Sequence, residues 1–552
     1  MLNDPMKLLE VLRSGSIATE LVKPMAKKRN YDRIDRVMRR FNTEDILSGI
    51  IEFQYMDLAD NLRLNKAELI AGVLLKYNIN NSKYKYLFRD SERLLVYAEK
   101  VVLAQGISEI FERSVAIKDA SFEEKKKVEK SVMMKSKHIF HRGDAYINQL
   151  IEFSSELYCK FDQDINQAIG FTFSECRNLL IFIYQKYHKV TNNLNKKRME
   201  SLSVMGREVD SSGDIMQSVK EGYIYRIKKT ELYDKFNEDK VNNMIEYLKV
   251  DLGIQSDFNK IEDFNILYAK PIIDFGNYIY VALPINSIQN LPKLFHYEFI
   301  VGKKINKEAR NRYTCWRGEV LEKITVRYMR RLFNKNKVYQ SLYYYDGRKR
   351  FEADVTAIKD NTTIICECKS KLLLLDTLKG DIESLDNDFQ AAVGKAYEQA
   401  VRTQSWIIEE REFEYIEESE EIIRIKLPSK NKIFKLCVVA DHLGWIPASI
   451  SDYIPGIPIE ELPLVINIYD LDIITKECNN FKEFKEYLEC RINYKNRLMS
   501  MDELEIFLAI RSKKNIFEEA QEKDMVFVDR FTVEIDQKYY QKAYEWLMKF
   551  KV

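Results

Sequence analysis

The sequence predicts a multidomain protein of the α/β class, with an α-helical N-terminal half followed by an α/β core with a mixed central sheet. Three observations lead to this prediction. The chain has 552 residues, more than one ordinary domain holds. Residues 1–215 show repeated helical periodicity and no strong strand pattern. After residue 215, runs with strand character alternate with amphipathic helical stretches, as in a sheet packed against helices.

Changes in composition divide the chain into four expected regions. Residues 207–218 are polar and contain Ser-Ser-Gly, so they are the best candidate for a linker. With 46% hydrophobic and 31% charged residues, the chain can form ample core. The regions are a helical scaffold or sensing domain at 1–215, a mixed α/β connecting domain at 216–300, an α/β core at 301–475, and a helical extension with a terminal strand and helix at 476–552.

Helical stretches dominate the first region. At residues 31–41 apolar side chains recur at helical spacing, and the segment 23–40 is strongly basic. This basic face could contact a phosphate backbone, although a solvated helix face explains it more simply. His138 and His141 have no nearby cysteine pair or third histidine, so we favour a structural role over metal binding. Further helices are expected at 91–115, 121–143 and 171–190.

The connecting region contains both kinds of element. A helix is expected at residues 239–253, and the run at 266–285 has strand character. Residues 275–278 read as a turn that divides this run into two strands. The region can therefore form a small sheet.

Two strands joined by a tight turn lie at the centre of the core. Residues 351–358 and 362–371 alternate apolar and polar side chains, and residues 359–361 have the composition of a turn. Successive side chains of a strand point to opposite faces of its sheet. This alternation places three polar residues on one side of the sheet: Asp354, Glu367 and Lys369.

Two carboxylates and an ammonium in this arrangement suit phosphodiester hydrolysis. Hard oxygen ligands bind Mg²⁺ or Mn²⁺, which polarises a phosphoryl group and acidifies a bound water. The lysine can orient the attacking water or neutralise charge that develops on the phosphate. Upstream, Glu319 and Glu322 share one face of an expected helix at 317–333, and either could complete the metal site. A downstream helix at 386–406 carries Lys395, Gln399 and Arg402 along one stripe.

This order of elements resembles the PD-(D/E)XK nuclease superfamily. In that family a glutamate-bearing helix precedes a strand with a metal-binding Asp, a strand ending in Glu-x-Lys, and a helix that often carries Gln. The resemblance covers roughly 130 of the 552 residues, centred on the segment 316–404, and implies a restriction-endonuclease-like core that binds Mg²⁺, with Mn²⁺ as an alternative. Ala353 stands where the family has Pro, a common departure in so loose a motif.

The resemblance also implies roles for single residues. Gln399, rather than Gln390, would orient the lysine or the nucleic-acid backbone. The implied catalytic residues are Asp354, Glu367, Lys369 and Gln399. The implied metal ligands are Glu319 or Glu322, Asp354, Glu367 and the backbone carbonyl of Cys368.

Basic residues and tyrosines crowd the sequence next to this motif. Between residues 323 and 350 nine residues are basic and only Asp346 is acidic, with Tyr339 and the tyrosines at 343–345 interleaved. Basic side chains contact phosphates, and tyrosines stack on bases or sugars. The residues that we expect to bind nucleic acid are Arg327, Arg330, Arg331, Lys335, Lys337, Arg348, Lys349, Arg350, Lys371 and Lys395.

The C-terminal third is expected to extend the sheet and then to end in helices. The apolar runs at 432–445 and 461–475 could add strands, and we favour a structural role for Asp441 and His442 at the end of the first run. The remaining expected elements are helices at 479–492 and 500–510, the latter with Ser500 as its N-cap, a strand at 525–535 and a helix at 537–550.

Cysteine usage and hydropathy favour a cytoplasmic protein. The eight cysteines are scattered without the spacing of a disulfide framework, which suits a reducing compartment. Cys366 and Cys368 alternate with the carboxylate face, so we expect both thiols in the core. No apolar run approaches a membrane span, and nothing near residue 1 resembles an export signal.

These observations favour a metal-dependent nuclease acting on DNA, with defence against foreign DNA as a setting. Two alternatives stay open: a catalytically silent scaffold or interaction protein with a nuclease fold, and an RNase. Net charge is only +2, so nucleic acid would have to be bound by local basic patches. Residues 393–396 lack the pattern of a phosphate-binding loop, so translocation would need a partner protein; a homo-oligomer is equally compatible.

Overall fold

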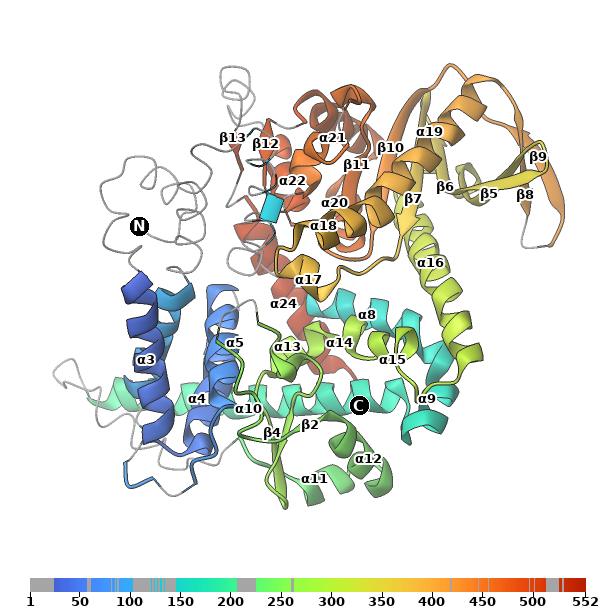
Figure 1. Cartoon of the computed structure of the whole chain (residues 1–552). Helices are drawn as coiled ribbons and strands as arrows, with labels where there is room; N and C mark the ends of the chain where they lie inside the picture. Colours follow the sequence, from blue (N-terminus) through green and yellow to red (C-terminus); the bar gives the residue numbers. More distant parts are fainter. Residues whose placement is uncertain are drawn as a thin grey trace. The chain divides into compact units, whose positions relative to one another are not determined.

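The structure, a computed structural model, describes residues 24–56, 61–102, 145–205, 225–512, 526–528 and 531–552 except for a few positions, and isolated positions between 121 and 134. It is a mixed α/β protein, helix-rich in its N-terminal half and sheet-rich in its C-terminal half (Figure 1). The predicted linker at 207–218 and both His138 and His141 lie outside the described residues. Two compact units make up the chain: 1–119, 138–313 and 537–552 form unit 1, and 120–137 and 314–536 form unit 2.

Helices form most of unit 1. The stripe expected at 31–41 is confirmed, because Ile34, Met38 and Phe41 are buried in α3 and just after it. On the basic face of α3, Arg39 pairs with Asp35 at 3.0 Å. The helices are α3 (Pro24–Arg40), α4 (Thr43–Met56), α5 (Asn61–Leu74), α8 (Ile147–Tyr158), α9 (Asp162–Ile169), α10 (Phe173–Met205), α11 (Lys229–Tyr233), α12 (Glu238–Leu248), α13 (Pro284–Gln289), α14 (Leu291–Leu294) and α15 (His296–Ile300).

A small four-stranded sheet completes unit 1. Its order is β1-β4-β3-β2, with β1 (Ile227–Lys228), β2 (Lys249–Val250), β3 (Ile272–Asp274) and β4 (Tyr278–Val281). The turn expected at 275–278 is confirmed: Gly276 has a positive φ of 84°, and its amide donates to Asp274 Oδ1 at 2.9 Å. Glycine adopts this conformation without steric cost.

Unit 2 is built on a seven-stranded mixed sheet. Its order is β11-β10-β7-β6-β5-β8-β9; β7, β10 and β11 are parallel, and the other neighbours are antiparallel. In Figure 1 the β8–β9 hairpin lies at one end of this sheet. The strands are β5 (Val338–Asp346), β6 (Lys349–Lys359), β7 (Thr362–Lys369), β8 (Glu412–Ile416), β9 (Ile422–Lys426), β10 (Lys432–Val439) and β11 (Leu464–Asn467).

The predicted central hairpin corresponds to β6 and β7. Asp360 and Asn361 connect the two strands, and both have positive φ, 45° and 56°. Two such residues in succession are typical of the two-residue turn that matches the twist of antiparallel strands. Aspartate and asparagine tolerate this backbone better than other residues with a side chain.

Helices cover both faces of the seven-stranded sheet. Lys435, which is paired with Ile365, donates to Gln404 of α19 at 2.8 Å. Cys368 has the opposite phase in β7, and its Sγ lies 3.5 Å from Thr325 Oγ1 of α16. The two helices therefore pack on opposite faces. The helices before and over the sheet are α16 (Lys307–Met329), α17 (Leu375–Leu378), α18 (Ile382–Phe389), the π-helical turn η5 (Gln390–Gly394) and α19 (Lys395–Ile408).

A short segment far from the core in sequence also belongs to unit 2. Ser131 Oγ donates to the carbonyl of Gly380 at 2.6 Å, and Met134 is buried in the apolar cluster of α18, η5 and β10. Lys130 pairs with Asp386 at 3.3 Å. Unit 2 is therefore assembled from two separate stretches of the chain.

Beyond the sheet, several expected elements differ from those observed. The run at 461–475 is a strand only as far as Asn467, whose side chain accepts from the Asp470 amide and begins α20; a short apolar run alone cannot distinguish strand from buried helix. Asp502, rather than Ser500, caps α22. The elements are α20 (Ile468–Glu477), α21 (Phe481–Asn493), β12 (Leu498–Met499), α22 (Glu503–Arg511), β13 (Val526–Phe527) and α24 (Val533–Lys549).

Candidate active site

Strands β6 and β7 bring the three predicted polar residues together. Lys369 Nζ lies 3.3 Å from Asp354 Oδ2 and 3.7 Å from Glu367 Oε2. All three side chains are at least mostly buried. Both carboxylates therefore approach the same ammonium nitrogen.

Glu367 is a fully buried carboxylate whose hydrogen-bonding capacity is unused. Its relative exposure is 0%, and neither carboxylate oxygen has a hydrogen-bond partner. Burial raises the pKa of Glu367 well above its usual range, and the nearby Asp354 carboxylate raises it further. A buried acceptor pair without donors costs folding free energy.

The structure distinguishes the two candidate glutamates of α16. Burial raises the pKa of Glu322 to about 7, and the negative charges of Asp354 and Glu352 contribute. Gln340 Nε2 donates to Glu322 Oε2 at 3.4 Å. The Glu319 side chain, in contrast, is 51% exposed and pairs with Lys323 at 3.6 Å. Glu322 therefore belongs to the acidic cluster.

Lys369 remains a cation in this environment. Burial alone lowers the pKa of its ammonium, but Asp354 and Glu367 together raise that pKa above the usual value. The Nζ also donates to the backbone carbonyl of Cys368 at 3.2 Å. The lysine is thus held between two carboxylates, where it partly neutralises an otherwise anionic cluster.

The backbone around Cys368 supports the cluster. Its amide donates to Asp354 Oδ2 at 2.7 Å, which fixes the rotamer of that carboxylate. The thiols of Cys366 and Cys368 are buried, and burial raises the pKa of both well above the usual value, so neither is a reactive thiolate. The carbonyl of Cys368, implied by the family resemblance as a metal ligand, bonds to Lys369 here.

A backbone irregularity in β5 lies beside the acidic cluster. Gln340 contacts Glu322 on α16, but the hydroxyl of Tyr344, four residues later, lies 3.1 Å from Thr403 Oγ1 on α19. Strict alternation would place positions 340 and 344 on one face. Between them Ser341 has a positive φ of 57°, and the β5–β6 ladder has no pair between Ser341 and Asp354. The side chains change faces at this point, beside the acidic cluster.

The donor set suits a hard divalent cation. Glu322, Asp354 and Glu367 offer carboxylate oxygens, and those of Glu367 are unused. Among the described residues, however, no group of three His, Cys, Asp or Glu side chains is close enough together to hold a metal ion. A cation would therefore have to compete with the Lys369 ammonium for Asp354 and Glu367.

Comparison with known proteins adds nothing to this geometry. No family model, curated protein or solved structure matches the chain. The likeness to the PD-(D/E)XK superfamily therefore rests on this chain's own residues. A separate finding concerns membranes: among the described residues, no helix combines the length and the apolar character that a membrane span requires.

Gln399 follows the motif in the sequence, but it does not form a hydrogen bond with the predicted catalytic lysine, Lys369. It is half-buried on α19, and among the described residues it forms no hydrogen bond with Lys369. Lys395 and Gln390 are exposed. On the same helix Arg402 lies 4.2 Å above the ring of Phe351. The role of Gln399 stays a prediction.

The predicted basic residues lie at two ends of the β5–β6 hairpin and on α16. Arg348, Lys349 and Arg350 are exposed at the turn, and Lys335 and Lys337 are exposed where β5 begins. Strand β5 has nine residues, so these groups are separated by roughly 25–30 Å. On α16 and just after it, Arg327 and Arg330 are exposed, while Arg331 pairs with Asp472 at 2.8 Å.

Two aspartates hold the loop that follows Lys369: Asp441, for which the sequence favours a structural role, and Asp388, which the sequence did not single out. Asp388 accepts from the Leu374 amide at 2.6 Å and pairs with Lys371 at 3.1 Å. Asp441 accepts from the Leu373 amide at 3.0 Å. The sequence feature that could have indicated this contact was the position of Asp441 at the end of an expected strand. Lys371 is thus engaged within the protein, and the loop is fixed against its neighbours.

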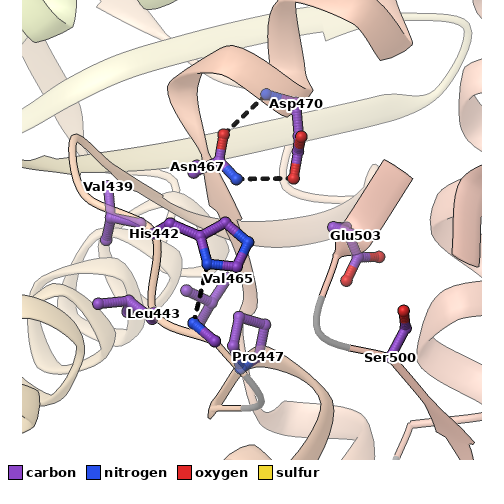
Figure 2. A pocket seen from close by; sticks show the side chains of 10 residues that line it. Val439, His442, Leu443, Pro447, Val465, Asn467, Asp470, Ser500 and Glu503 are labelled. Carbon is purple, nitrogen blue, oxygen red and sulfur yellow. Dashed lines mark hydrogen bonds between the residues drawn. The ribbon is translucent and has the colours of Figure 1, made fainter. Parts of the chain in front are cut away.

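A small pocket with polar and apolar walls adjoins the end of β10 (Figure 2). His442, Asp470, Ser500 and Glu503 face it, and Val439, the strand partner of Lys369, forms part of its wall. His442 Nδ1 accepts from the Gly444 amide at 3.1 Å, so this nitrogen carries no proton. The pocket has room for about one water molecule, which is too little for a substrate.

Proposed function

We propose that this chain is a divalent-cation-dependent nuclease that hydrolyses phosphodiester bonds, with DNA as its principal substrate. One observation carries the proposal: Asp354 and Glu367 flank the Lys369 ammonium within 4 Å, and both oxygens of the buried Glu367 lack hydrogen-bond donors. Such an assembly costs folding free energy, and this cost supports a functional role. The proposal agrees with the motif resemblance.

Each side chain has a distinct task in this proposal. Glu322, Asp354 and Glu367 would hold the cation through their carboxylates. The bound ion supplies polarisation of the phosphate and acidification of water. Lys369 would then stabilise negative charge on the phosphate oxygens or orient the attacking water, because its ammonium is already held next to both carboxylates.

The test is cleavage of supercoiled plasmid in Mg²⁺ or Mn²⁺. We expect wild type to nick the plasmid, and Asp354→Asn and Lys369→Ala to lose at least about 100-fold in rate, since each removes electrostatic stabilisation of the reacting phosphate. Glu486→Gln and Lys482→Ala on the surface of α21 are matched controls, because they make the same charge changes at an exposed ion pair. Both should cleave like wild type.

Three outcomes separate this proposal from its alternatives. Nicking that survives both active-site substitutions would remove the site assignment. Cleavage of an RNA competitor in preference to the plasmid would identify an RNase. Absence of hydrolysis of either polymer with any divalent cation would favour a catalytically silent scaffold.

A further inference from the structure

The end of the β5–β6 hairpin extends beyond its neighbour strand. The ladder between β6 and β7 begins at the pair Val355 and Cys366, so residues 349–354 of β6 run past the last partner on that side. The turn at its tip is open: Gly347 has a φ of 60°, and a Cβ there would meet nothing within 4 Å. The tip carries three consecutive exposed basic residues: Arg348, Lys349 and Arg350.

Aromatic rings accompany these basic groups. The Arg350 guanidinium lies 4.0 Å above the ring of Tyr343, and Lys349 Nζ lies 5.0 Å from the ring centre of Phe351. Tyr345, the cross-strand partner of Arg350, is 45% exposed. A planar guanidinium stacked on a ring keeps its outer face available for a further flat group.

The same row of side chains leads to the carboxylates. Tyr343 is paired with Glu352, and burial together with the charges of Glu352 and Glu322 raises the pKa of its hydroxyl. Tyr343 therefore lies within electrostatic range of the acidic cluster. Arg350 and Asp354 are four residues apart on one strand, about 13 Å. Glu352 lies between Arg350 and Asp354 on the strand, and its negative charge acts on Glu322 of the acidic cluster. The run of basic residues at the hairpin end therefore stops at Arg350.

We propose that this hairpin end, defined by Tyr343, Tyr345 and Arg350, binds a single-stranded segment of nucleic acid and leads it to the carboxylates. This inference rests on the proposed function and specifies its substrate. The exposed ring of Tyr345 and the Arg350 guanidinium, held by the half-buried Tyr343, can stack on unpaired bases, whereas the bases of a duplex are already stacked on one another. A site built for duplex alone would need only its phosphate contacts and base edges.

The experiment measures binding without cleavage. Fluorescein-labelled 20-nucleotide single-stranded DNA and the corresponding blunt duplex are titrated with the full chain in EDTA, and anisotropy gives the two dissociation constants. We expect the single strand to bind more tightly than the duplex. Arg350→Ala and Tyr345→Ala should each weaken single-strand binding at least about fivefold, with a smaller effect on the duplex.

Arg411→Ala is the matched control, because Arg411 is also an exposed arginine stacked on a ring, 4.4 Å from the centre of Trp406, on another part of the sheet. It should bind both DNAs like wild type. Tyr343→Phe keeps the ring and should retain single-strand binding, while Tyr343→Leu should lose it with an unchanged melting temperature.

Equal affinity for duplex and single strand, or equal losses in Arg350→Ala and Arg411→Ala, would overturn the inference. If the plasmid is still cleaved in a metal-dependent manner, only the single-strand assignment fails. If neither binding nor cleavage of any nucleic acid is found, the proposed function fails as well.

Discussion

At the scale of single residues, the chain contains two buried glutamates in opposite circumstances. Glu367 has no hydrogen-bond donor, and its nearest cation, Lys369, is shared with Asp354. Glu503, also buried, accepts from the Tyr487 hydroxyl and the Arg491 guanidinium, both at 2.8 Å. An ionised carboxylate is costly inside a protein unless partners compensate it. Burial raises the pKa of both carboxyls; at Glu503 the Arg491 charge and the two hydrogen bonds oppose that rise, whereas Glu367 has no such hydrogen bonds.

This contrast predicts opposite effects for the same substitution. Glu367→Gln should raise the free energy of unfolding at pH 8 by about 1 kcal/mol or more, because it removes the buried charge. Glu503→Gln should lower it by roughly 3 kcal/mol, because Arg491 would then be buried without its partner. Urea unfolding of both variants measures the difference. A destabilised Glu367→Gln protein would show that the carboxylate has a structural role.

Glu322 gives stability a specific pH dependence. Its pKa is about 7 in the folded protein and 4.5 in an ordinary environment. Below about pH 4.5 folded and unfolded chains are both protonated at this group. Between about pH 4.5 and 7 only the folded protein keeps the proton on Glu322. The contribution of this group to the free energy of unfolding therefore falls by about 1–3 kcal/mol as the pH rises through this range, and above about pH 7 it is constant.

Glu322→Gln tests this dependence. In buffer without divalent ions, the difference in unfolding free energy between Glu322→Gln and wild type should grow between about pH 5 and 7, in favour of the variant. The exposed Glu319→Gln one turn earlier is the control and should give a difference that does not vary with pH. A flat difference for Glu322→Gln would mean that its carboxylate is solvated.

At the scale of secondary-structure elements, the irregularity at Ser341 decides which side chains meet. A residue with a side chain rarely adopts a φ of 57°, and such residues cluster at functional sites because surrounding contacts hold them there. Here the change of faces lets Gln340 reach Glu322 on α16 while Tyr344 packs under α19. The strain therefore contributes to assembling the cluster.

Two substitutions at this position separate strain from side-chain chemistry. Ser341→Gly should leave the unfolding free energy unchanged or raise it by up to about 1 kcal/mol, since glycine adopts positive φ without cost. Ser341→Val should lower it by roughly 2 kcal/mol, because a β-branched side chain is strongly disfavoured in this conformation. Thermal unfolding measures both. Equal stability of the two variants would be incompatible with a strained backbone at Ser341.

Much of the site follows from local sequence patterns, and the remainder does not. Period-two alternation was enough to gather Asp354, Glu367 and Lys369, because the β6–β7 turn keeps the two strands in register. Spacing alone could not choose between Glu319 and Glu322, which share a helix face; burial made the choice. The positive φ of Ser341 leaves no signature in the sequence, since serine usually occupies ordinary strand conformations.

The fold shows the same division. Helical periodicity and the extension of the sheet by β10 were predictable from apolar patterns, although its parallel direction was not, and residues 468–475 form a helix where a strand was expected. An apolar run of that length fits both, and the Asn467 cap decides. The loop contacts of Asp388 and Asp441 depend on which distant amides lie nearby, which only tertiary structure determines.

At the scale of the whole molecule, unit 2 is discontinuous, and this predicts how a fragment behaves. A fragment of residues 314–536 lacks the segment 120–137, and with it the buried Met134 side chain and the Ser131 hydrogen bond to Gly380. We expect this fragment alone to melt at a lower temperature than the same fragment with a synthetic 120–137 peptide added in excess, by mass action.

A peptide carrying Met134→Ala and Ser131→Ala is the control and should stabilise the fragment much less, because loss of a buried methionine side chain alone costs about 2–5 kcal/mol. Identical melting curves with and without the wild-type peptide would place the segment outside the cooperative unit.

The composition of the two units also constrains synthesis on the ribosome. Unit 1 needs residues 537–552, where Tyr539 stacks on Tyr146 at 5.3 Å and Gln185 donates to the Leu547 carbonyl. Unit 2 needs a stretch translated long before its sheet. Unit 1 cannot be completed until residues 537–552 have been translated, so shorter partly made chains expose the apolar surface that these residues cover. A stop codon just before residue 537 would therefore damage the unit whose first residues are made earliest.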